Sequence, residues 1–429
     1  SLFMVLVVEI ARGTRDFLPE EMHKRRYVES LFRHVFECYG YQEIQTPTFE
    51  QLELFTAKSG ESVLDEIYEF KDKGNRHLAL RPELTAPVMR MYVDQMQMEP
   101  KPLKLFYFGN CYRYDRPQKG RYREFLQAGC ELIGTDKPEA IAELISLSMD
   151  MLHTIGLSHV ELEVGNLKLL SMVFDELSLS KEQQQDLLPC IDKEEFDEVE
   201  DLLYQWELDS SKIVDFMSLL RSRYTDVLFH LFSNEKNGTD EIKRLQHIID
   251  LLKNHFSINT VKLNMGIVRG LDYYTGTVFE VKAPALGAEK QICGGGEYNL
   301  IGLFGGREMP TAGFALGFDR TLLAMDEENL SFPQQKLDYY IIPITDEMIP
   351  FSLEIASVLR RTHRCKCDVD LLRRGIGKAL KYANSRHSTV SIPIGPDELN
   401  DDVLTLRNMK TGEQKQVSID DFKNNPDIL

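Results

Sequence analysis

The sequence predicts an α+β protein in which a strand-rich part carries a helical insertion and is followed by a smaller α/β domain. Three observations predict this fold class. Two strand-like runs at residues 105–133 flank a polar loop. The stretch from about residue 170 to 257 has helical spacing of apolar residues and many acidic ones. Beyond residue 336, strand-like and helix-like patterns alternate, which is typical of βαβ units.

The elements before the hairpin are a strand, a helix and an extended segment. An apolar run at residues 2–8 predicts an N-terminal strand, and apolar residues at helical spacing predict a helix over residues 20–40 that ends at a glycine. Residues 41–49 have an extended pattern. The turn at residues 81–85 marks a helix N-terminus, with Glu83 or Thr85 near the cap.

The hairpin concentrates arginines on both of its arms, at residues 105–113 and 121–133. Alternation predicts that four side chains share one face of the second arm: Arg121, Arg123, Phe125 and Gln127. Guanidinium groups beside an aromatic ring suit a triphosphate attached to a base, because the fork binds phosphate oxygens and the ring stacks on the purine. The alternative interpretation is a charge-rich, solvated hairpin.

Two later segments combine glycines with charged and aromatic residues. Residues 268–280 place Arg269, Asp272 and two tyrosines around two glycines, just ahead of the glycine cluster at 293–298. This is either a binding site or a hairpin whose glycines serve turns and whose tyrosines pack. Residues 313–320 precede apolar residues at helical spacing, so they are either a buried helix start or a turn whose arginine holds a phosphate.

The domain boundary is predicted at the polar stretch of residues 329–336. The first domain then covers residues 1–332, with the insertion at about 170–257, and the second covers residues 336–429. Within the second domain, strands are expected at 338–344, 367–371 and 389–394, and helices at 351–361 and 376–385.

Charge and cysteine content bear on the partners and the compartment of the protein. The net charge is −18, but residues 175–210 hold 13 acidic residues against two lysines, while residues 360–387 hold nine basic residues against two aspartates. The basic stretch is therefore able to meet phosphate although the whole chain is acidic. Its alternative interpretation is a solvated helix face. Seven irregularly spaced cysteines indicate a reducing compartment, and they form no zinc pattern. No apolar run approaches a membrane span.

Together these segments resemble the class II aminoacyl-tRNA synthetases, and specifically the histidyl-tRNA synthetase family. The matching stretches are residues 112–127 (motif 2), 313–320 (motif 3), 46–50 (motif 1), 269–274 and 294–298 (the histidine signatures) and 12–19. Asp115 and Asp319 depart from the family, which usually has glutamate at both positions. The shorter carboxylate of Asp115 must reach about one methylene further to make the ATP contact that the resemblance implies.

The resemblance implies a fold, a reaction and partners. The catalytic domain is expected to contain an antiparallel sheet flanked by helices, and the C-terminal α/β domain is expected to bind an anticodon. The expected reaction joins L-histidine to ATP, which enters as a substrate together with Mg²⁺, and transfers histidine to the 3′ end of histidine tRNA. The family further implies a homodimer in the cytoplasm, without a membrane partner and without a protein-bound metal.

The resemblance also implies the site residues. Arg113 and Arg269 are the expected catalytic residues, which stabilise charge on the α-phosphate from two sides. The residues expected to bind histidine are Glu83, Leu84, Thr85, Arg113, Gln127, Glu131, Arg269, Tyr273, Tyr274 and Tyr298. Those expected to bind ATP are Arg113, Asp115, Arg121, Phe125 and Arg320, and those expected to contact tRNA are Lys119, Arg373 and Arg374.

More detailed roles follow from the same resemblance. Glu131 and the Tyr274 hydroxyl are expected to pair with the imidazole, while the ammonium is held by Glu83, Thr85 and Gln127. Arg121 and Arg320 are expected to hold the β- and γ-phosphates, and Phe125 to stack on adenine. Two other functions remain open: a non-catalytic regulator of ATP phosphoribosyltransferase with the same fold, and a synthetase-like nucleic-acid-binding protein. The regulators usually lack the anticodon domain and the arginines, both of which are present here.

Overall fold

The computed structural model describes residues 8–116, 119–287 and 290–426, and the side chain of Glu61 is left out of the description. The strand expected at residues 2–8 falls, apart from Val8, outside the described residues. The chain divides into two compact units, residues 1–18 with 25–331 and residues 19–24 with 332–429.

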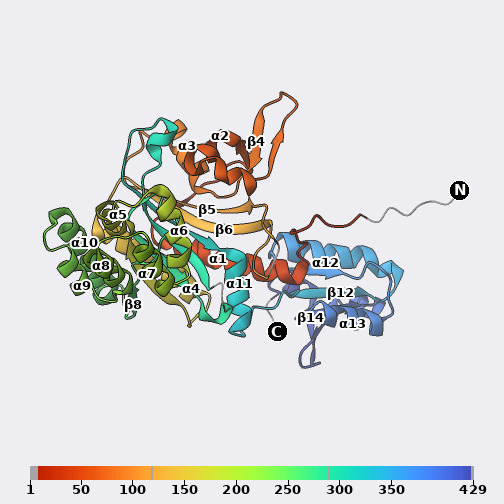
Figure 1. Ribbon diagram of the computed structural model, residues 1–429. Helices are drawn as coiled ribbons and strands as arrows, with labels where there is room; N and C mark the ends of the chain where they lie inside the picture. Colours follow the sequence, from red (N-terminus) through yellow and green to blue (C-terminus); the bar gives the residue numbers. More distant parts are fainter. Residues whose placement is uncertain (1–7, 117–118, 288–289, 427–429) are drawn as a thin grey trace. The chain divides into compact units, whose positions relative to one another are not determined.

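An eight-stranded sheet forms the centre of the larger unit, in the order β1-β5-β6-β11-β10-β9-β7-β8 (Figure 1). Its strands are β1 Gln42–Glu43, β5 Leu103–Tyr112, β6 Glu124–Ile133, β7 Glu161–Asn166, β8 Val261–Leu263, β9 Tyr274–Lys282, β10 Gln291–Tyr298 and β11 Thr311–Gly317. The pairs from β5 to β7 are antiparallel, whereas the two edge strands β1 and β8 pair in parallel with their neighbours. The expected antiparallel sheet is therefore mixed at its edges.

Helices and a small sheet surround this centre. The three-stranded sheet β2-β4-β3 consists of β2 Phe49–Gln51, β3 Glu69–Lys71 and β4 His77–Leu80. The helices outside the insertion are α1 Pro19–Cys38, α2 Leu52–Ser59, α3 Thr85–Gln95, α4 Pro138–Thr154 and α11 Phe318–Glu327, with short 3₁₀ turns at Glu61–Asp65, Pro284–Leu286 and Ile301–Phe304. Phe36 of α1 stacks on Phe106 of β5 and Phe314 of β11, so this helix packs on one face of the sheet.

The segment between β7 and β8 is helical, as its apolar spacing predicts. Its helices are α5 Leu167–Glu176, α6 Lys181–Asp192, α7 Phe196–Gln205, α8 Ser210–Arg221, α9 Thr225–Leu231 and α10 Lys236–Asn254. Figure 1 shows them gathered at one side of the sheet. The last helix, α10, packs on α4, which joins the insertion to the body of the unit.

The arginine-bearing hairpin is formed by β5 and β6, which pair from Leu103↔Ile133 to Tyr112↔Glu124. One part of the expected pattern is wrong. Regular strand structure begins at Glu124, so alternation does not extend back to Arg123. The Arg123 side chain instead lies over the Tyr114 ring and donates to the main-chain oxygen of Asp115. Arg121, Phe125 and Gln127 do line one cavity.

The glycine clusters lie in central strands rather than in turns. Residues 294–296 belong to β10, and Gly313 belongs to β11, with α11 beginning only at Phe318. Because paired residues of antiparallel strands share a face, Gly313 lies on the same face as its partner Glu131. A Cβ atom on Gly313 would lie 2.2 Å from a Glu131 carboxylate oxygen. Because these glycines have no side chains, they leave room for polar groups on this face of the sheet.

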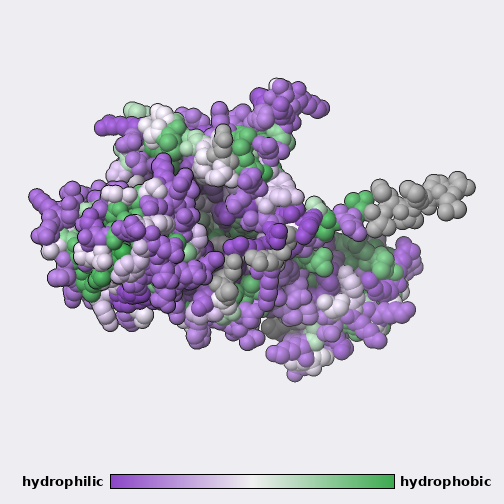
Figure 2. Space-filling view, in the orientation of Figure 1, coloured by the Kyte–Doolittle hydropathy of each residue, from purple (hydrophilic) through white to green (hydrophobic). Residues whose placement is uncertain are grey.

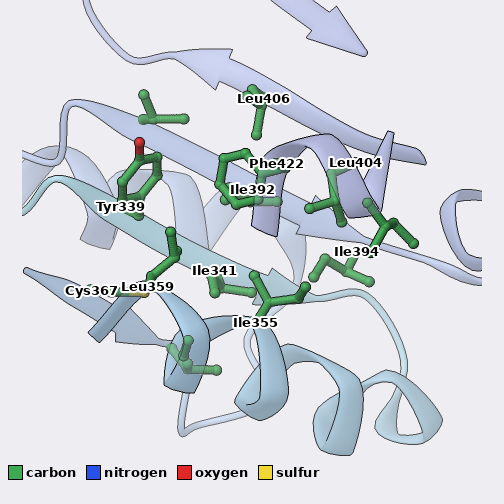
Figure 3. Packing of buried hydrophobic residues seen from close by; sticks show 14 of the residues in the cluster. Tyr339, Ile341, Ile355, Leu359, Cys367, Ile392, Ile394, Leu404, Leu406 and Phe422 are labelled. Atoms are coloured by element: carbon green, nitrogen blue, oxygen red, sulfur yellow. The ribbon is translucent and has the colours of Figure 1, made fainter. Parts of the chain in front are cut away.

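The smaller unit has a five-stranded sheet in the order β13-β12-β14-β15-β16. Its elements are β12 Tyr339–Pro343, the 3₁₀ turn Asp346–Met348, α12 Ile349–Arg361, β13 Cys367–Val369, α13 Ile376–Ser385, β14 Val390–Ile394, α14 Pro396–Asn400, β15 Val403–Asn408, β16 Gln414–Ser418 and α15 Ile419–Asn424. The pairs β12·β13 and β12·β14 are parallel, as expected for βαβ units. Figure 3 shows Ile341, Ile355 and Phe422 in its buried core.

The surface shown in Figure 2 is largely hydrophilic, and apolar residues appear there as scattered patches. Within the described ranges, no helix combines the length and the apolar character needed to cross a lipid bilayer.

Candidate active site

Two cavities adjoin on the glycine-bearing face of the large sheet. The first, which we call the tyrosine cavity, has a volume of about 250 Å³ and is lined by Tyr273, Tyr274 and Tyr298 together with polar side chains. The second, the arginine cavity, has a volume of about 400 Å³ and is lined by four arginines, Arg113, Arg121, Arg269 and Arg320. Both cavities are lined by Arg113 and Gln127, so ligands in the two would meet at these residues.

Glu131 lies at the base of the tyrosine cavity, where only 1% of it is exposed. The hydroxyls of Tyr107 (3.0 Å) and Tyr298 donate to its carboxylate. Burial raises the pKa of Glu131 to about 7, although hydrogen bonds from Tyr298, Thr85 and Tyr107 act in the opposite direction. Burial and the neighbouring Glu131 raise the pKa values of the Tyr107 and Tyr298 hydroxyls well above 10, so both remain protonated donors.

A second carboxylate enters the same cavity from the N-terminus of α3. Glu83 accepts hydrogen bonds from the main-chain nitrogens of Thr85 (2.6 Å) and Ala86 (3.2 Å), which are unsatisfied donors of the first helical turn. The Lys58 ammonium lies 3.4 Å from Glu83 and 4.6 Å from the centre of the Tyr273 ring. Glu83 is thus rigidly held next to a nearly buried cation.

The arginine cavity combines guanidinium groups with one aromatic ring. Arg113 donates to the main-chain oxygen of Pro82 (3.0 Å), and its guanidinium carbon lies 5.2 Å from the centre of the Phe125 ring. Arg320 donates to the main-chain oxygen of Gln291 (2.7 Å). Arg121 and Asp115 also line this cavity. The arrangement suits a polyanion that carries a flat ring.

Asp319 also lines the arginine cavity, and its contacts hold neighbouring segments of the chain together. Its carboxylate accepts from Arg15 and Arg25, each at 2.7 Å, and from the main-chain nitrogen of Leu126 at 3.0 Å. Burial opposes its ionisation, but the two guanidinium groups and the hydrogen bonds lower the pKa of Asp319 overall. The Arg15 guanidinium also lies 3.3 Å from the centre of the Tyr122 ring. Arg15, from the segment at residues 12–19, therefore contacts both Asp319 and the part of the hairpin next to Arg121.

Arg269 lies between the arginine cavity and a third cavity of about 510 Å³, the lysine cavity, which is lined by Lys193, Lys262, Lys282 and Lys290 together with several carboxylates. Its guanidinium contacts Asp192 of the insertion and Gln291 of β10. It does not line the tyrosine cavity.

The structure gathers eight of the predicted histidine-site residues around the tyrosine cavity: Glu83, Thr85, Arg113, Gln127, Glu131, Tyr273, Tyr274 and Tyr298. All five predicted ATP-site residues line the arginine cavity. Leu84 does not line either cavity, because its side chain, 2% exposed, packs in the core with Val88 and Tyr92.

The residues predicted to contact tRNA do not line either cavity. Lys119 belongs to the larger unit, and Arg373 and Arg374 belong to the smaller one. Lys119, beside the hairpin loop, is exposed and 3.1 Å from Glu327. Arg373 is exposed and pairs with the exposed Asp346 at 3.0 Å. Arg374 differs from it, since it pairs at 2.5 Å with the buried Asp370 and lies 4.2 Å from the centre of the Tyr382 ring.

Sequence reasoning missed several residues of the site, among them Lys58, Glu66, Tyr107, Asp192 and Gln291. The hairpin register holds a signal for Tyr107, which pairs with Gly129 and so lies on the Glu131 face. Asp192 carries a weaker signal, an acid in the last turn of a helix. Neither Lys58 nor Gln291 stands out in a single sequence, because only the folded chain brings them to the cavities.

Two groups of side chains carry donor atoms that bind metal ions in proteins. Glu66 and Asp115 line the arginine cavity, and Mg²⁺ prefers one or two carboxylates plus substrate phosphates, so these residues fit a nucleotide-borne Mg²⁺. Among the described residues, Cys190, Glu195 and Glu198 form a group whose ligand atoms lie within 4.8 Å of one another. None of the three residues lines the tyrosine or the arginine cavity, and we assign no function to the group.

Known proteins match this chain over nearly its whole length. The family model described as Histidyl-tRNA synthetase matches residues 13–321, and the model described as Anticodon binding domain matches residues 338–425. The Histidine--tRNA ligase of Methanocaldococcus jannaschii is 43% identical over 427 residues, which cover 98% of this chain and 100% of that protein.

Solved structures agree in fold. The apo histidyl-tRNA synthetase of S. aureus has a TM-score of 0.73 at 29% identity and covers 97% of this chain and 99% of its own. A structure from Bacillus halodurans C described as an ATP phosphoribosyltransferase regulatory subunit/histidyl-tRNA synthetase has a TM-score of 0.78 at 22% identity, with 91% and 99% covered. At that identity the likeness concerns the fold alone. The family models and the extent of the matches show that the chain belongs to the histidyl-tRNA synthetase family, with a synthetase part followed by an anticodon-binding domain.

Proposed function

We propose that this chain is a histidine–tRNA ligase that activates L-histidine with ATP and transfers it to the 3′ end of histidine tRNA. The observation that carries this proposal is the junction of the tyrosine and arginine cavities at Arg113 and Gln127. An amino acid in the first cavity would present its carboxylate to the α-phosphate of a nucleotide in the second. Positioning of this kind is the main catalytic task when both reactants are already in their reactive forms.

Histidine is the amino acid that suits the tyrosine cavity. One imidazole nitrogen would donate to the Glu131 carboxylate and the other would meet the Tyr274 hydroxyl, so each nitrogen has a dedicated partner. The ammonium group would bind Glu83, Thr85 and Gln127. A site with two such partners rejects apolar isosteres strongly, because its own buried groups would otherwise stay unpaired. We therefore expect no editing activity.

Adenylate formation requires no general base, because the carboxylate of histidine is ionised at neutral pH. Its oxygen would attack the α-phosphorus as the bond to the β-phosphate breaks and pyrophosphate leaves. Arg113 and Arg269 would stabilise the charge that develops on the α-phosphate, while Arg121 and Arg320 hold the β- and γ-phosphates. Phe125 would stack on adenine. Mg²⁺ that enters with ATP would neutralise phosphate charge next to Glu66 and Asp115.

The second step uses tRNA. A hydroxyl of the terminal ribose would attack the histidyl carbonyl carbon, and AMP would leave with the bonding electrons. Lys119 is an exposed residue of the hairpin loop and would contact tRNA next to Gly120 and Arg121, which line the arginine cavity. Arg373 and Arg374 would contact it in the smaller unit, whose sequence matches anticodon-binding domains.

Two further features belong to the same proposal. The protein would act as a homodimer joined partly through the motif 1 segment. Phe49 in this segment is 51% exposed and contacts Phe70, which is 41% exposed, edge to face, so an apolar surface is available. It would act in the cytoplasm, where cysteines remain reduced, and all seven cysteines of the chain are free thiols in the structure.

Histidine-dependent exchange of labelled pyrophosphate into ATP tests the proposal. We expect exchange with L-histidine and none with the other amino acids, followed by charging of histidine tRNA. A well-folded protein without exchange would overturn the proposal and favour the non-catalytic regulator, whose fold is the same. Binding of the nucleotide alone does not discriminate, so turnover must be measured.

A further inference from the structure

We propose that Asp192 and Gln291 are positioning residues for Arg269, so that the helical insertion takes part in adenylate formation. This inference rests on the proposed function, because it assumes that Arg269 acts on the α-phosphate. It adds two residues that the family resemblance did not indicate and connects the acidic insertion with the chemistry.

The geometry around Arg269 carries the proposal. Its Nε donates to Asp192 Oδ1 at 3.2 Å, and a terminal nitrogen lies 3.4 Å from Asp192 Oδ2. The other terminal nitrogen donates to Gln291 Oε1 at 2.7 Å. The contacts thus come from two sides and engage all three nitrogens of one planar group. Since the side chain of Arg269 is 56% exposed, these contacts limit its rotamers where packing does not.

The place of Asp192 in its own helix supports a role outside that helix. It is the last residue of α6, and no basic residue lies in that turn. The C-terminal end of a helix carries a partial negative charge, which disfavours a carboxylate there. A residue that breaks a local rule is expected to have a compensating interaction elsewhere. The ion pair with Arg269, which crosses from the insertion to the loop before β9, is that interaction.

Gln291 connects two arginines of the site. Its side chain accepts from Arg269, and its main-chain oxygen accepts from Arg320 at 2.7 Å. The side chain lies over Gly294, where a Cβ atom would come within 2.4 Å of Gln291 Nε2. The register of the β9–β10 pairing shifts between Gln291 and Cys293, so Gln291 lies beyond the regular part of the ladder. One residue therefore orients Arg269 directly and fixes Arg320 through the backbone.

The experiment measures single-turnover formation of histidyl-adenylate by the full-length protein. Asp192→Asn should lower the rate about three- to fivefold, the factor expected when a half-exposed ion pair is lost. The KM for histidine should change much less, because Asp192 does not line the tyrosine cavity. Asp192→Glu should restore most of the rate, since it keeps the carboxylate. Gln291→Ala, which retains the backbone bond to Arg320, should have an effect of similar size.

A matched control lies in the same insertion. Asp197 is fully exposed and lies 3.8 Å from Arg221, so Asp197→Asn removes the same charge from the insertion without touching the site. It should leave the rate unchanged. A rate loss in this control equal to that in Asp192→Asn would assign the effect to the net charge of the insertion and would overturn the proposal.

A double-mutant cycle separates positioning from a structural effect. In an Arg269→Ala background, Asp192→Asn should cause no further loss, because Asp192 acts only through Arg269. Additive losses would overturn the proposal, and so would a faster rate in Asp192→Asn, which would make the pair a restraint on Arg269. Thermal melting of each variant verifies folding. If the wild type lacks histidine-dependent exchange, the proposed function fails; if it exchanges normally and Asp192→Asn equals it, only this inference fails.

Discussion

At the residue scale, the site depends on titratable and charged groups whose surroundings set their state. Glu131 is the clearest case, because burial moves its pKa to about 7 while two tyrosines remain donors to it. The carboxylate is thus partly ionised near neutral pH, and its ionised form can accept from an imidazole N–H group. Arg269, in contrast, is held at the edge of the arginine cavity by Asp192 and Gln291.

Glu131→Gln should change both substrate binding and the pH dependence of stability. The KM for histidine should rise by a factor of about ten or more, since one lost buried hydrogen bond costs on the order of 1–3 kcal/mol, while the KM for ATP stays nearly constant. A parallel rise of both constants would contradict the assignment of the tyrosine cavity to histidine.

The stability effect has a definite sign. The folded-state pKa of Glu131 lies above the value of 4.5 for an exposed glutamate, so its contribution to stability is present below pH 4.5 and is lost as the pH rises through about 7. The loss should reach about 3 kcal/mol, from 1.36 kcal/mol per pKa unit. Glu131→Gln should remove it, so that the free energy of unfolding falls less between pH 5 and pH 8 than in the wild type. Chemical denaturation at both pH values checks this.

Arg269→Ala should lower the rate of adenylate formation about a hundredfold or more, as expected when one donor to the transition state is removed. Histidine binding should change less, because Arg269 does not line the tyrosine cavity. Rapid-quench measurement of the adenylate gives the rate, and equilibrium dialysis gives the affinity. An adenylation rate near that of the wild type would rule out a catalytic role.

At the element scale, the alternation of residues along the central strands creates the site. On one face, Phe106, Cys130 and Phe314 are buried, and α1 covers two of them with Phe36. On the other face, glycines at positions 129, 294, 296 and 313 leave space in the middle of the sheet. A sheet with ordinary side chains at these positions would fill both cavities with its own atoms.

Gly313→Ala should therefore impair histidine binding. Its Cβ would lie 2.2 Å from Glu131 and 2.5 Å from the main-chain oxygen of Cys130, so Glu131 must move away from its tyrosine partners. We expect the KM for histidine to rise at least about tenfold, because a buried carboxylate loses hydrogen bonds worth roughly 1–3 kcal/mol. Steady-state pyrophosphate exchange measures the effect.

Gly377→Ala is the control for this substitution. It lies in α13, where a Cβ meets nothing within 4 Å and φ is not positive, so it should stabilise the protein slightly and leave activity unchanged. Equal losses of activity in both variants would show that the substitution acts through general destabilisation.

At the scale of the whole molecule, the charges are divided between regions of different function. The acidic residues concentrate in the insertion, and the basic ones concentrate in the smaller unit around α12 and α13. A tRNA that contacts both units would therefore meet positive charge in the smaller unit despite a net charge of −18.

Arg373→Glu should weaken tRNA binding and flatten its dependence on salt, because a phosphate contact releases counterions. Histidine-dependent pyrophosphate exchange should not change. Its pair with Asp346 is exposed on both sides, so the fold should tolerate the reversal. Filter binding at several salt concentrations provides the measurement.

Arg374→Glu separates folding from binding. It would remove the guanidinium group that pairs with the buried Asp370 and place a second negative charge next to this carboxylate, so the melting temperature should fall as well. If Arg373→Glu binds tRNA with the salt slope of the wild type, the tRNA contact proposed for it is wrong.

The sequence by itself determined the fold class and the family, and it predicted where the chemistry takes place. Periodicity identified the β5–β6 hairpin, the helical segment between β7 and β8, and the β12, α12, β13, α13 and β14 elements, because these patterns arise from local spacing of apolar residues. The residue types of the motifs pointed to nucleotide and amino acid binding. The roles of the individual residues remain predictions, although the structure brings most of them to two adjoining cavities.

Only the tertiary structure decided which residues meet across the fold. It placed Arg123 against Tyr114, Leu84 in the core and the glycine clusters inside central strands, and it brought Tyr107 to Glu131 and Asp192 to Arg269. These contacts join positions far apart in sequence, such as Asp192 and Arg269, which are separated by 77 residues. Local periodicity reports which face of an element is buried, whereas the partner on the facing element depends on strand order, register and the packing of the whole chain.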